Sequence, residues 1–309
     1  MKTKEKVCLL SNDVEDHSIW FNTLRYDTGK LVLDEGMPIL LDIYEKFNIK
    51  STFFFTGYMA ENFPGVVKMT IDRGHEIASH GYSHTVENGF DVMPLDKQIL
   101  HLKKSKSLLE DISGSQVISF RAPALRVNEH TITALLETGF KIDSSIASQR
   151  FDMFLSFGGV KKLKWLTAPR LAYKTSAKNL FERGTDGLVE VPLSAYLFPY
   201  TSTTLRIFPM FTRMQTFLVN AEAKITGKPM VFDIHPNEFI DESQNERVIK
   251  RRTKNFIKYL LADLLRGKLK VKNLGKDAIP IYENLISYYQ KKNYSFLTIR
   301  EYCEKNNLL

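Results

Sequence analysis

Two histidines and a cluster of acidic residues are the side chains whose types and spacing could do chemistry. His80 and His84 stand four residues apart, a spacing that lets both imidazoles reach one cation from the same side of a turn or helix. Three carboxylates, those of Asp13, Glu15 and Asp16, fall within four residues directly after an apolar run. Two neutral nitrogens and one carboxylate leave coordination positions open for water, which is typical of a catalytic metal site rather than a structural one.

Each half of this candidate site also has a simpler interpretation. A His-x-x-x-His pair is weakly specific, because histidines at this spacing often lie on a surface or in a core. Acidic residues after a strand often cap a helix and occupy its first turn, where they interact favourably with the helix dipole. A cation changes the balance, since it relieves the mutual repulsion of the carboxylates and leaves one of them free to act as a base.

The elements that must position these residues alternate between short apolar runs and helical patterns. This alternation predicts parallel strands joined by crossover helices, and hence an α/β fold. The predicted strands are 7–10, 51–55, 76–79, 117–120, 140–143, 189–193, 230–234 and 296–299. The predicted helices are 36–47, 64–73, 95–112, 128–138 and 245–266. We expect one domain over residues 1–309, with an irregular insertion around 149–187, where the pattern is least regular.

The unusual polar residues follow these predicted strands. The acidic cluster comes after the first strand, His80 and His84 after the third, Arg121 after the fourth, Asp143 at the end of the fifth, and His235 after the seventh. A parallel barrel gathers the C-terminal ends of its strands on one face, so we expect these side chains to meet there. This convergence predicts an enzyme.

Composition excludes disorder and leaves the partner open. Hydrophobic residues make up 43% and charged residues 25% of the 309 positions, as in folded globular proteins. The net charge of +8 suits an acidic partner, such as a polyanionic glycan, a nucleotide-linked sugar, a membrane face or nucleic acid. No recognised nucleic-acid-binding motif accompanies this charge, so we expect no nucleic acid partner. Much of the excess lies in the basic segment 247–276, which we interpret as a solvated helix face.

Cysteines and apolar stretches bear on the compartment. Cys8 and Cys303 are too few for a disulfide framework, and neither belongs to a Cys-x-x-Cys motif. The N-terminal segment lacks the apolar region of a secretory signal, and no apolar run has the length of about 18 residues that a membrane span requires. The sequence therefore predicts a cytoplasmic protein.

Five segments appear in an order that is far more specific than any one of them. They are 9–16, 51–57, 74–84, 120–123 and 234–236, and in this order they resemble the motifs of polysaccharide deacetylases of the NodB-homology type, or carbohydrate esterase family 4. The resemblance runs from about Val7 to about Glu301. It implies a distorted (β/α) barrel of about seven strands and a divalent cation, most often Zn²⁺, with Co²⁺ or Mn²⁺ as alternatives.

The resemblance also implies roles for individual residues. Asp13 matches the general base, and His80 and His84 match the metal ligands. Arg121 matches the arginine that orients the base carboxylate. His235 matches the general acid that protonates the leaving amine.

Two positions depart from the commonest pattern of the family. The acidic run is Asp-Val-Glu-Asp, as in relatives that space base and ligand by one residue, which favours Glu15 as the third ligand with Asp16 as the rival. Ile146 stands where many relatives carry a second aspartate that tunes the acid histidine. The pKa of His235 is then expected to depend on another group, for which Asp143 and Asp233 are the candidates.

The function implied by the resemblance is metal-dependent hydrolysis of an N-acetyl group, or less readily an N-formyl group, on a sugar during polysaccharide or glycolipid biosynthesis. The substrate would be a carbohydrate, carried on a nucleotide or a lipid, and the basic segment 247–276 could make peripheral membrane contact. Two alternatives stay open. One is a metal amidohydrolase acting on a non-sugar amide, and the other is a catalytically dead glycan-binding barrel. Asp13, Arg121 and His235 together argue against the dead barrel, because binding alone needs no base, orienting group and acid.

Overall fold

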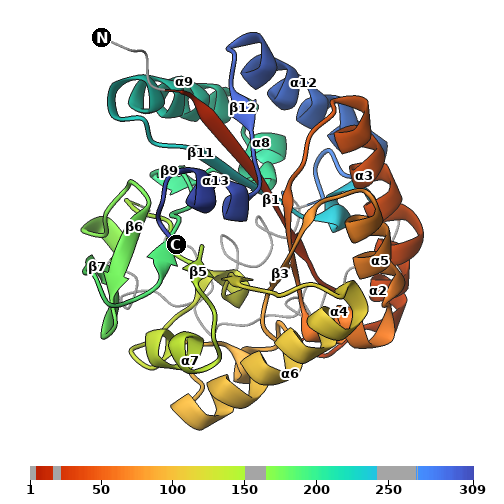
Figure 1. Cartoon of the computed structure of the whole chain (residues 1–309). Helices are drawn as coiled ribbons and strands as arrows, with labels where there is room; N and C mark the ends of the chain where they lie inside the picture. Colours follow the sequence, from red (N-terminus) through yellow and green to blue (C-terminus); the bar gives the residue numbers. More distant parts are fainter. Residues whose placement is uncertain (1–4, 17–21, 150–164, 242–268, 270) are drawn as a thin grey trace, which may run out of the picture.

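Seven parallel strands form the centre of the described structure. The structure is a computed structural model that describes residues 5–16, 22–149, 165–241, 269 and 271–309. In spatial order the seven strands are β11 (Met230–Ile234), β1 (Val7–Val14), β2 (Thr52–Phe55), β3 (Glu76–Ser79), β4 (Ser119–Phe120), β5 (Ile142–Asp143) and β8 (Val189–Glu190). The sheet curls, and helices cover its outer face (Figure 1). The predicted α/β barrel of about seven strands is thereby confirmed.

Shorter strands extend this sheet at two places. β12 (Ser295–Phe296) pairs in parallel with β1, and the hairpin of β6 (Tyr173–Ser176) and β7 (Asn179–Arg183) adds antiparallel strands beside β8. β9 (Ala195–Tyr196) and β10 (Phe198–Pro199) form a separate antiparallel pair. The segment expected to be irregular, 149–187, thus contains β6 and β7, while its residues 150–164 lie outside the described part. The hairpin escaped notice because its strands are short and alternate only weakly in hydrophobicity.

Helices connect the strands, and four of them match the predicted helices 36–47, 64–73, 95–112 and 128–138. The helices are α2 (Tyr26–Leu31), continued by a π-helical stretch (Val32–Gly36), α3 (Met37–Lys46), α4 (Gly57–Asn62), α5 (Gly65–Asp72), α6 (Leu95–Ser113), α7 (Thr131–Glu137), α8 (Ser202–Ile207), α9 (Pro209–Thr226), α12 (Ala278–Lys291) and α13 (Ile299–Lys305). The predicted helix 245–266 falls on residues outside the described part. None of the described helices is long and apolar enough to cross a membrane.

Side chains on the two faces of the sheet pack in two different layers. On β1, Cys8 and Leu10 belong to the large core between sheet and helices, whereas Leu9 belongs to a second cluster that includes Phe54 and Val231. This alternation is the two-residue period of a strand that is buried on both faces. Helix α13 closes the N-terminal ends of the strands, where the Ile299 N–H donates to Thr52 Oγ1 at 2.8 Å. A functional site is therefore expected at the opposite, C-terminal ends of the strands.

Asp143 and Glu190 form a buried pair of carboxyl groups under the hairpin. They are register partners on β5 and β8, and both are fully buried. Ser145 Oγ donates to Asp143 Oδ1 at 2.5 Å, and the Ile146 N–H donates to Glu190 Oε1 at 3.1 Å. Burial raises the pKa of Asp143, and burial together with the charge of Asp143 raises the pKa of Glu190 well above its ordinary value. Both shifts favour the protonated form, so the pair keeps a proton to a higher pH than the unfolded chain does.

This pair should make the protein less stable as the pH rises. The folded state keeps a proton that the unfolded chain releases above a pH of about 4, so the free energy of unfolding falls toward alkaline pH, by up to about 1.4 kcal/mol per pH unit and proton. We expect Glu190→Gln to flatten this slope. The free energy of unfolding is measured in urea from about pH 5 to 8, which lies above the pKa of a carboxyl group in the unfolded chain. Glu137→Gln, at an exposed position on α7, is the matched control and should leave the slope as it is. An equally steep slope in both variants would assign the pH dependence to other groups.

Candidate active site

The predicted site residues meet at the C-terminal ends of four strands, β11, β1, β3 and β4. Asp13 lies near the end of β1 and Glu15 follows it, while His80 follows β3 and Arg121 follows β4. His235 follows β11, which pairs with β1 in a register that sets Ser11 beside Asp233. His84 lies in the turn after β3 and is also buried. The structure therefore brings the base, ligand, arginine and acid candidates together.

Glu15, His80 and His84 are arranged as a possible cation site. Their ligand atoms lie within 4.8 Å of one another. The Oε2 atom of Glu15 is 3.1 Å from His84 Nε2 and 3.9 Å from His80 Nε2. Burial lowers the pKa of His80 to about 4 and that of His84 well below its ordinary value, so both imidazoles are neutral, which is the form that binds metals.

The orientation of the His80 ring also fits a metal ligand. His80 Nδ1 lies 2.9 Å from the Arg121 carbonyl oxygen, to which it donates when it carries the proton. That contact fixes the tautomer and leaves the Nε2 lone pair facing Glu15. Among the residues that the structure describes, no hydrogen-bond donor reaches this buried Nε2. A neutral, buried, unpartnered nitrogen beside a carboxylate fits a cation.

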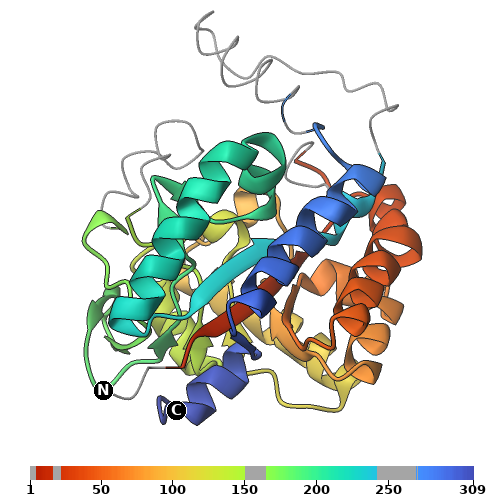
Figure 2. The same cartoon turned by 90° about the horizontal axis from the view of Figure 1, so that it is seen from above.

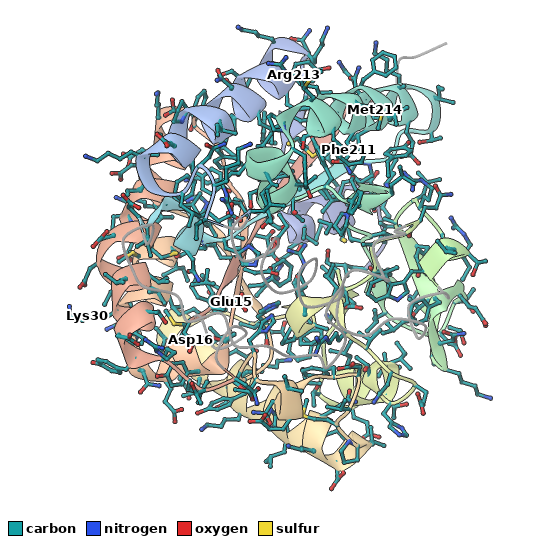
Figure 3. All side chains as sticks on the ribbon, turned by 180° about the vertical axis from the view of Figure 1, so that it is seen from behind. Glu15, Asp16, Lys30, Phe211, Arg213 and Met214 are labelled. Atoms are coloured by element: carbon teal, nitrogen blue, oxygen red, sulfur yellow. The ribbon has the colours of Figure 1, made fainter. Side chains whose placement is uncertain are left out.

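Asp16 points away from this group. Its carboxylate accepts the Arg25 backbone N–H at 2.6 Å, and Asp16 belongs to neither of the possible metal groups in the described part of the chain. Glu15 and Asp16 both follow the end of β1 at Val14, and of the two it is Glu15 whose carboxylate lies beside His80 and His84. Figure 3 labels both acids at the end of β1. The geometry thus favours Glu15 over Asp16 as the third ligand.

Arg121 is a fully buried cation that holds Asp13. Its Nη1 donates to Asp13 Oδ1 at 2.9 Å, to Asp233 Oδ1 at 2.7 Å and to Ser11 Oγ at 2.9 Å. Its Nε and Nη2 donate to the carbonyl and hydroxyl oxygens of Ser144 at 3.1 and 3.0 Å. With so many partners the guanidinium has one position, and it fixes the carboxylate of Asp13.

The two carboxylates on Arg121 titrate differently. Burial alone would raise the pKa of Asp13, but His80, which is charged in the acid range where Asp13 titrates, and the permanent charge of Arg121 lower it to about 2. Burial and the charge of Asp13 instead raise the pKa of Asp233 to about 7. Asp13, Asp233 and His235 also meet the distances of a cation site. Arg121 already neutralises the two acids, so Glu15, His80 and His84 form the better site.

His235 is surrounded by carboxylates. Its Nδ1 lies 3.7 Å from Glu238 Oε1 and 4.0 Å from Asp233 Oδ2, and its Nε2 lies 3.7 Å from Glu15 Oε1. Burial would lower the pKa of His235, but the nearby carboxylates of Glu238, Asp233 and Glu15 raise it to about 10. A histidine that carries its proton at neutral pH can act as a general acid.

Glu238 is the site residue that the sequence interpretation missed. It lies in the short 3₁₀ helix Pro236–Phe239, three residues after His235. Its carboxylate contacts Arg206 Nε and Ser202 Oγ of α8. Of the two predicted tuning groups, Asp233 is near His235, whereas the described contacts of Asp143 are with Ser145 and Glu190. The i,i+3 spacing was the only signal for Glu238.

Replacing Glu238 by glutamine should slow catalysis more than it weakens substrate binding. The variant keeps the shape but loses the charge that holds the His235 proton, so we expect kcat to fall about tenfold with little change in KM. Arg206 loses its buried ionic partner as well, so thermal unfolding must be measured alongside. Ser202→Ala, which removes a contact to the same carboxylate, is the matched control with a smaller effect. An unchanged kcat in the folded Glu238→Gln protein would remove Glu238 from the site.

One backbone amide after Arg121 faces the site. The Ala124 N–H donates to His84 Nε2 at 3.0 Å, whereas the Ala122 N–H is taken up by Ser145 Oγ at 2.9 Å. Ala124 has a left-handed backbone with φ of 52°, which an L residue adopts at a cost. This conformation aims its amide at the histidine. The His84 Nε2 lone pair can either accept this hydrogen bond or bind a cation. If it bound a cation, the Ala124 N–H would be free to donate to another group in the site.

Comparison of the sequence with known proteins shows a similarity to one family. Residues 15–142 match the profile described as polysaccharide deacetylase. The chain is 32% identical over 173 residues to a peptidoglycan deacetylase of Helicobacter pylori, which covers 55% of this chain and 56% of that protein. It is 28% identical over 229 residues to the peptidoglycan deacetylase-like protein FGM2 of Gibberella zeae, covering 70% and 64%. The chain therefore spans less than two thirds of the length of both relatives.

Solved structures share the fold at low sequence identity. A candidate polysaccharide deacetylase from Mycobacterium smegmatis has a TM-score of 0.54 at 21% identity, covering 97% of this chain and 94% of that chain. A CE4 family pseudoenzyme from Bacillus anthracis has a TM-score of 0.52 at 12% identity, covering 97% and 66%. The fold is thus shared by a pseudoenzyme, and activity must be argued from the site. Family profile, relatives and fold agree with the motifs, and this chain is similar to polysaccharide deacetylases of the NodB-homology type over residues 15–142.

Proposed function

We propose that the protein hydrolyses an N-acetyl group on a sugar of a polysaccharide or its precursor. The observation that carries this proposal is the arrangement around Glu15. The possible cation group lies on one side, the Asp13–Arg121 pair on another, and a protonated His235 on a third. Amide hydrolysis needs these three functions at once, and a binding site needs none of them.

Asp13 is placed to activate water. It is ionised, because Arg121 and the other positive neighbours hold its pKa at about 2. Its Oδ2 atom lies 3.6 Å from His80 Nε2, so a water molecule beside the histidine is within reach of the carboxylate. Asp13 accepts a proton from this water as the oxygen attacks the amide carbon, while Arg121 prevents the carboxylate from turning away.

His235 and Ala124 act on the other atoms of the amide. The attack converts the carbonyl oxygen into an oxyanion, and the Ala124 N–H is positioned to donate to it. Collapse of the tetrahedral intermediate breaks the C–N bond. His235 Nε2 gives its proton to the departing nitrogen, which leaves as the amine of the sugar, and acetate is the second product.

The residues present fit a divalent cation. Two neutral imidazoles and one carboxylate suit Zn²⁺, and Co²⁺ or Mn²⁺ are further candidates for the same ligands. When bound, such an ion supplies a Lewis acid for the amide carbonyl and lowers the pKa of water. Glu15, His80 and His84 would hold it. Neither Arg121 nor His235 would take part in binding, which leaves both free for their own tasks.

The proposed substrate is a glycan that carries N-acetylated sugars. The relatives from Helicobacter pylori and Gibberella zeae are named as a peptidoglycan deacetylase and a peptidoglycan deacetylase-like protein, which supports an N-acetylated polysaccharide. We extend the proposal to precursors on a nucleotide or lipid carrier, since the net charge of +8 favours an anionic substrate. An N-formyl group fits the same chemistry as a second choice.

Acetate release from a defined panel tests the proposal. The panel contains peptidoglycan fragments, N-acetylated oligosaccharides, nucleotide sugars and lipid-linked sugars, each assayed with Zn²⁺, Co²⁺ or Mn²⁺ and with chelator. We expect cation-dependent release from at least one of these glycans. Full activity after removal of all metal would overturn the mechanism, and release from a non-sugar amide alone would overturn the substrate class.

A further inference from the structure

Helix α9 presents an apolar face to the outside of the molecule. Among the described residues, thirteen large apolar side chains are exposed, and five of them lie on α9 or directly before it. Met210 is 82% exposed, Phe217 67% and Ile225 80%. Together with Met214 these positions recur at the spacing of one helix stripe. The five residues, which we call the α9 patch, are Phe208, Met210, Met214, Phe217 and Ile225.

The buried face of α9 is the more polar one. It consists of Thr212, Gln215, Thr216, Val219, Asn220 and Ala223. Gln215 Nε2 donates to the carbonyl oxygens of Tyr196 and Phe198 at 3.1 and 2.9 Å, and Tyr294 Oη donates to Asn220 Oδ1 at 3.0 Å. Turning the helix to bury its apolar face would leave these groups without partners, at a cost of about 1–3 kcal/mol each. The outward position of the patch is therefore fixed by the fold.

Cations accompany the patch, and acids are turned away from it. Arg213 and Lys224 are exposed on α9. Near the C-terminal end of the helix, the pKa of Lys6 is lowered first by the partial burial of Lys6 and then by the charges of Lys224 and Lys292. Within the described part of the chain, no carboxylate forms an ion pair with any of these four cations. The one acid of α9, Glu222, is directed inward to Arg170, with contacts of 2.6 and 2.7 Å. The face is thus both apolar and positively charged.

We propose that α9 docks the protein on an anionic lipid surface. A helix with aromatic and aliphatic side chains flanked by Lys and Arg binds in the interface of such a surface, where apolar burial and attraction to acidic headgroups add together. Figure 2 shows α9 and α12 beside β11 and β1 on one side of the molecule. A second copy of the chain fits less well. Antiparallel pairing of α9 would bring Arg213 of one copy near Lys224 of the other without an acid between them.

The α9 patch begins close to the catalytic end of the barrel. Phe208 and Met210 directly follow α8, whose Arg206 contacts Glu238, and α9 then leads into the start of β11. Figure 3 shows Phe211, Arg213 and Met214 on α9, apart from Glu15 and Asp16. A lipid surface that touches this end of α9 would lie beside the site. Given the proposed function, a glycan attached to a membrane lipid is then the preferred substrate, although the docking itself does not depend on hydrolysis.

Vesicle flotation with the full chain tests the docking. We expect binding to vesicles of phosphatidylcholine mixed with phosphatidylglycerol, little binding to phosphatidylcholine alone, and a decrease with added salt. The double variant Met210→Ser/Phe217→Ser should lower the partition coefficient about tenfold or more. Leu100→Ser is the matched control, because Leu100 is 66% exposed on α6, on the opposite side of the molecule in Figure 1.

Three results would overturn the docking proposal. They are equal binding to neutral and anionic vesicles, wild-type binding by the double variant, and a dimer in light scattering that the double variant abolishes without any vesicle binding. Acetate release from a soluble glycan is measured in parallel. It should be the same in the double variant and the wild type, so failure of docking and failure of hydrolysis can be told apart.

Discussion

His80→Ala is expected to remove both the bound cation and the hydrolytic activity. The imidazole of His80 is buried and neutral, and its Nε2 has no hydrogen-bond donor in the described structure, so its removal deletes one of three protein ligands. Replacing even an outer partner of a metal ligand costs about 10–100-fold in affinity, and loss of a ligand itself should cost more. Metal content per protein, measured by mass spectrometry, and acetate release should fall together.

His75 provides the matched control for this experiment. It is also a buried histidine with a lowered pKa, but its Nδ1 accepts the Ser51 N–H at 3.1 Å and its ring packs on Tyr44 and Phe53. His75→Ala should lower the melting temperature yet keep a full equivalent of metal. If His80→Ala kept its metal and His75→Ala lost it, the assignment of the ligands would be wrong.

Asp13→Asn is expected to retain the cation and to lose about 10²–10⁴-fold in kcat, which is the usual contribution of a positioned base. The amide has the shape of the carboxylate but cannot accept the proton of water. Glu15, His80 and His84 are untouched, so metal content should match the wild type. The separation of metal content from activity distinguishes a base from a ligand, and pre-steady-state acetate release would show that the chemical step is the slow one.

Asp233→Asn is the sharpest comparison for Asp13→Asn. Both carboxylates accept from Arg121 Nη1, but only Asp13 has an oxygen 3.6 Å from His80 Nε2. We expect the Asp233 variant to lose less activity, because Asp233 acts on His235 from 4.0 Å. Equal losses in the two variants would mean that Arg121 needs both partners and that Asp13 has no separate role as a base.

Much of the site could be predicted because the spacing of residues in the sequence indicates where each strand ends. The acidic cluster directly follows the first predicted strand, which is enough to place it at a strand end, whereas the preference for Glu15 over Asp16 came from the family motif. His80 and His84 follow a strand end, as does Arg121, and parallel strands bring their ends together whatever the loops between them do. The family motifs then supplied the roles that spacing alone left open.

Contacts between distant segments had no comparable signal. Glu238 is held by Arg206, which lies 32 residues earlier on a helix that the pattern did not predict. Helix α9 exposes its apolar stripe and buries its amide and hydroxyl side chains. The usual expectation that the apolar stripe of a helix faces the core would therefore predict the wrong orientation for α9. The register of β5 with β8, which sets Asp143 beside Glu190, joins two short strands that are separated in the sequence by the β6–β7 hairpin.

The pairing of β1 with β11 has a consequence for how the protein is made. Ser11 and Asp233 are 222 residues apart in sequence, yet their side chains are hydrogen-bonded. A ribosome releases Glu15, His80, His84 and Arg121 well before it reaches Asp233 and His235. In that interval β1 has one unpaired edge, which is a place where nascent chains associate. A chain that stops short of β11 would hold the residues for the cation and for the base, but it would have no acid to complete the reaction.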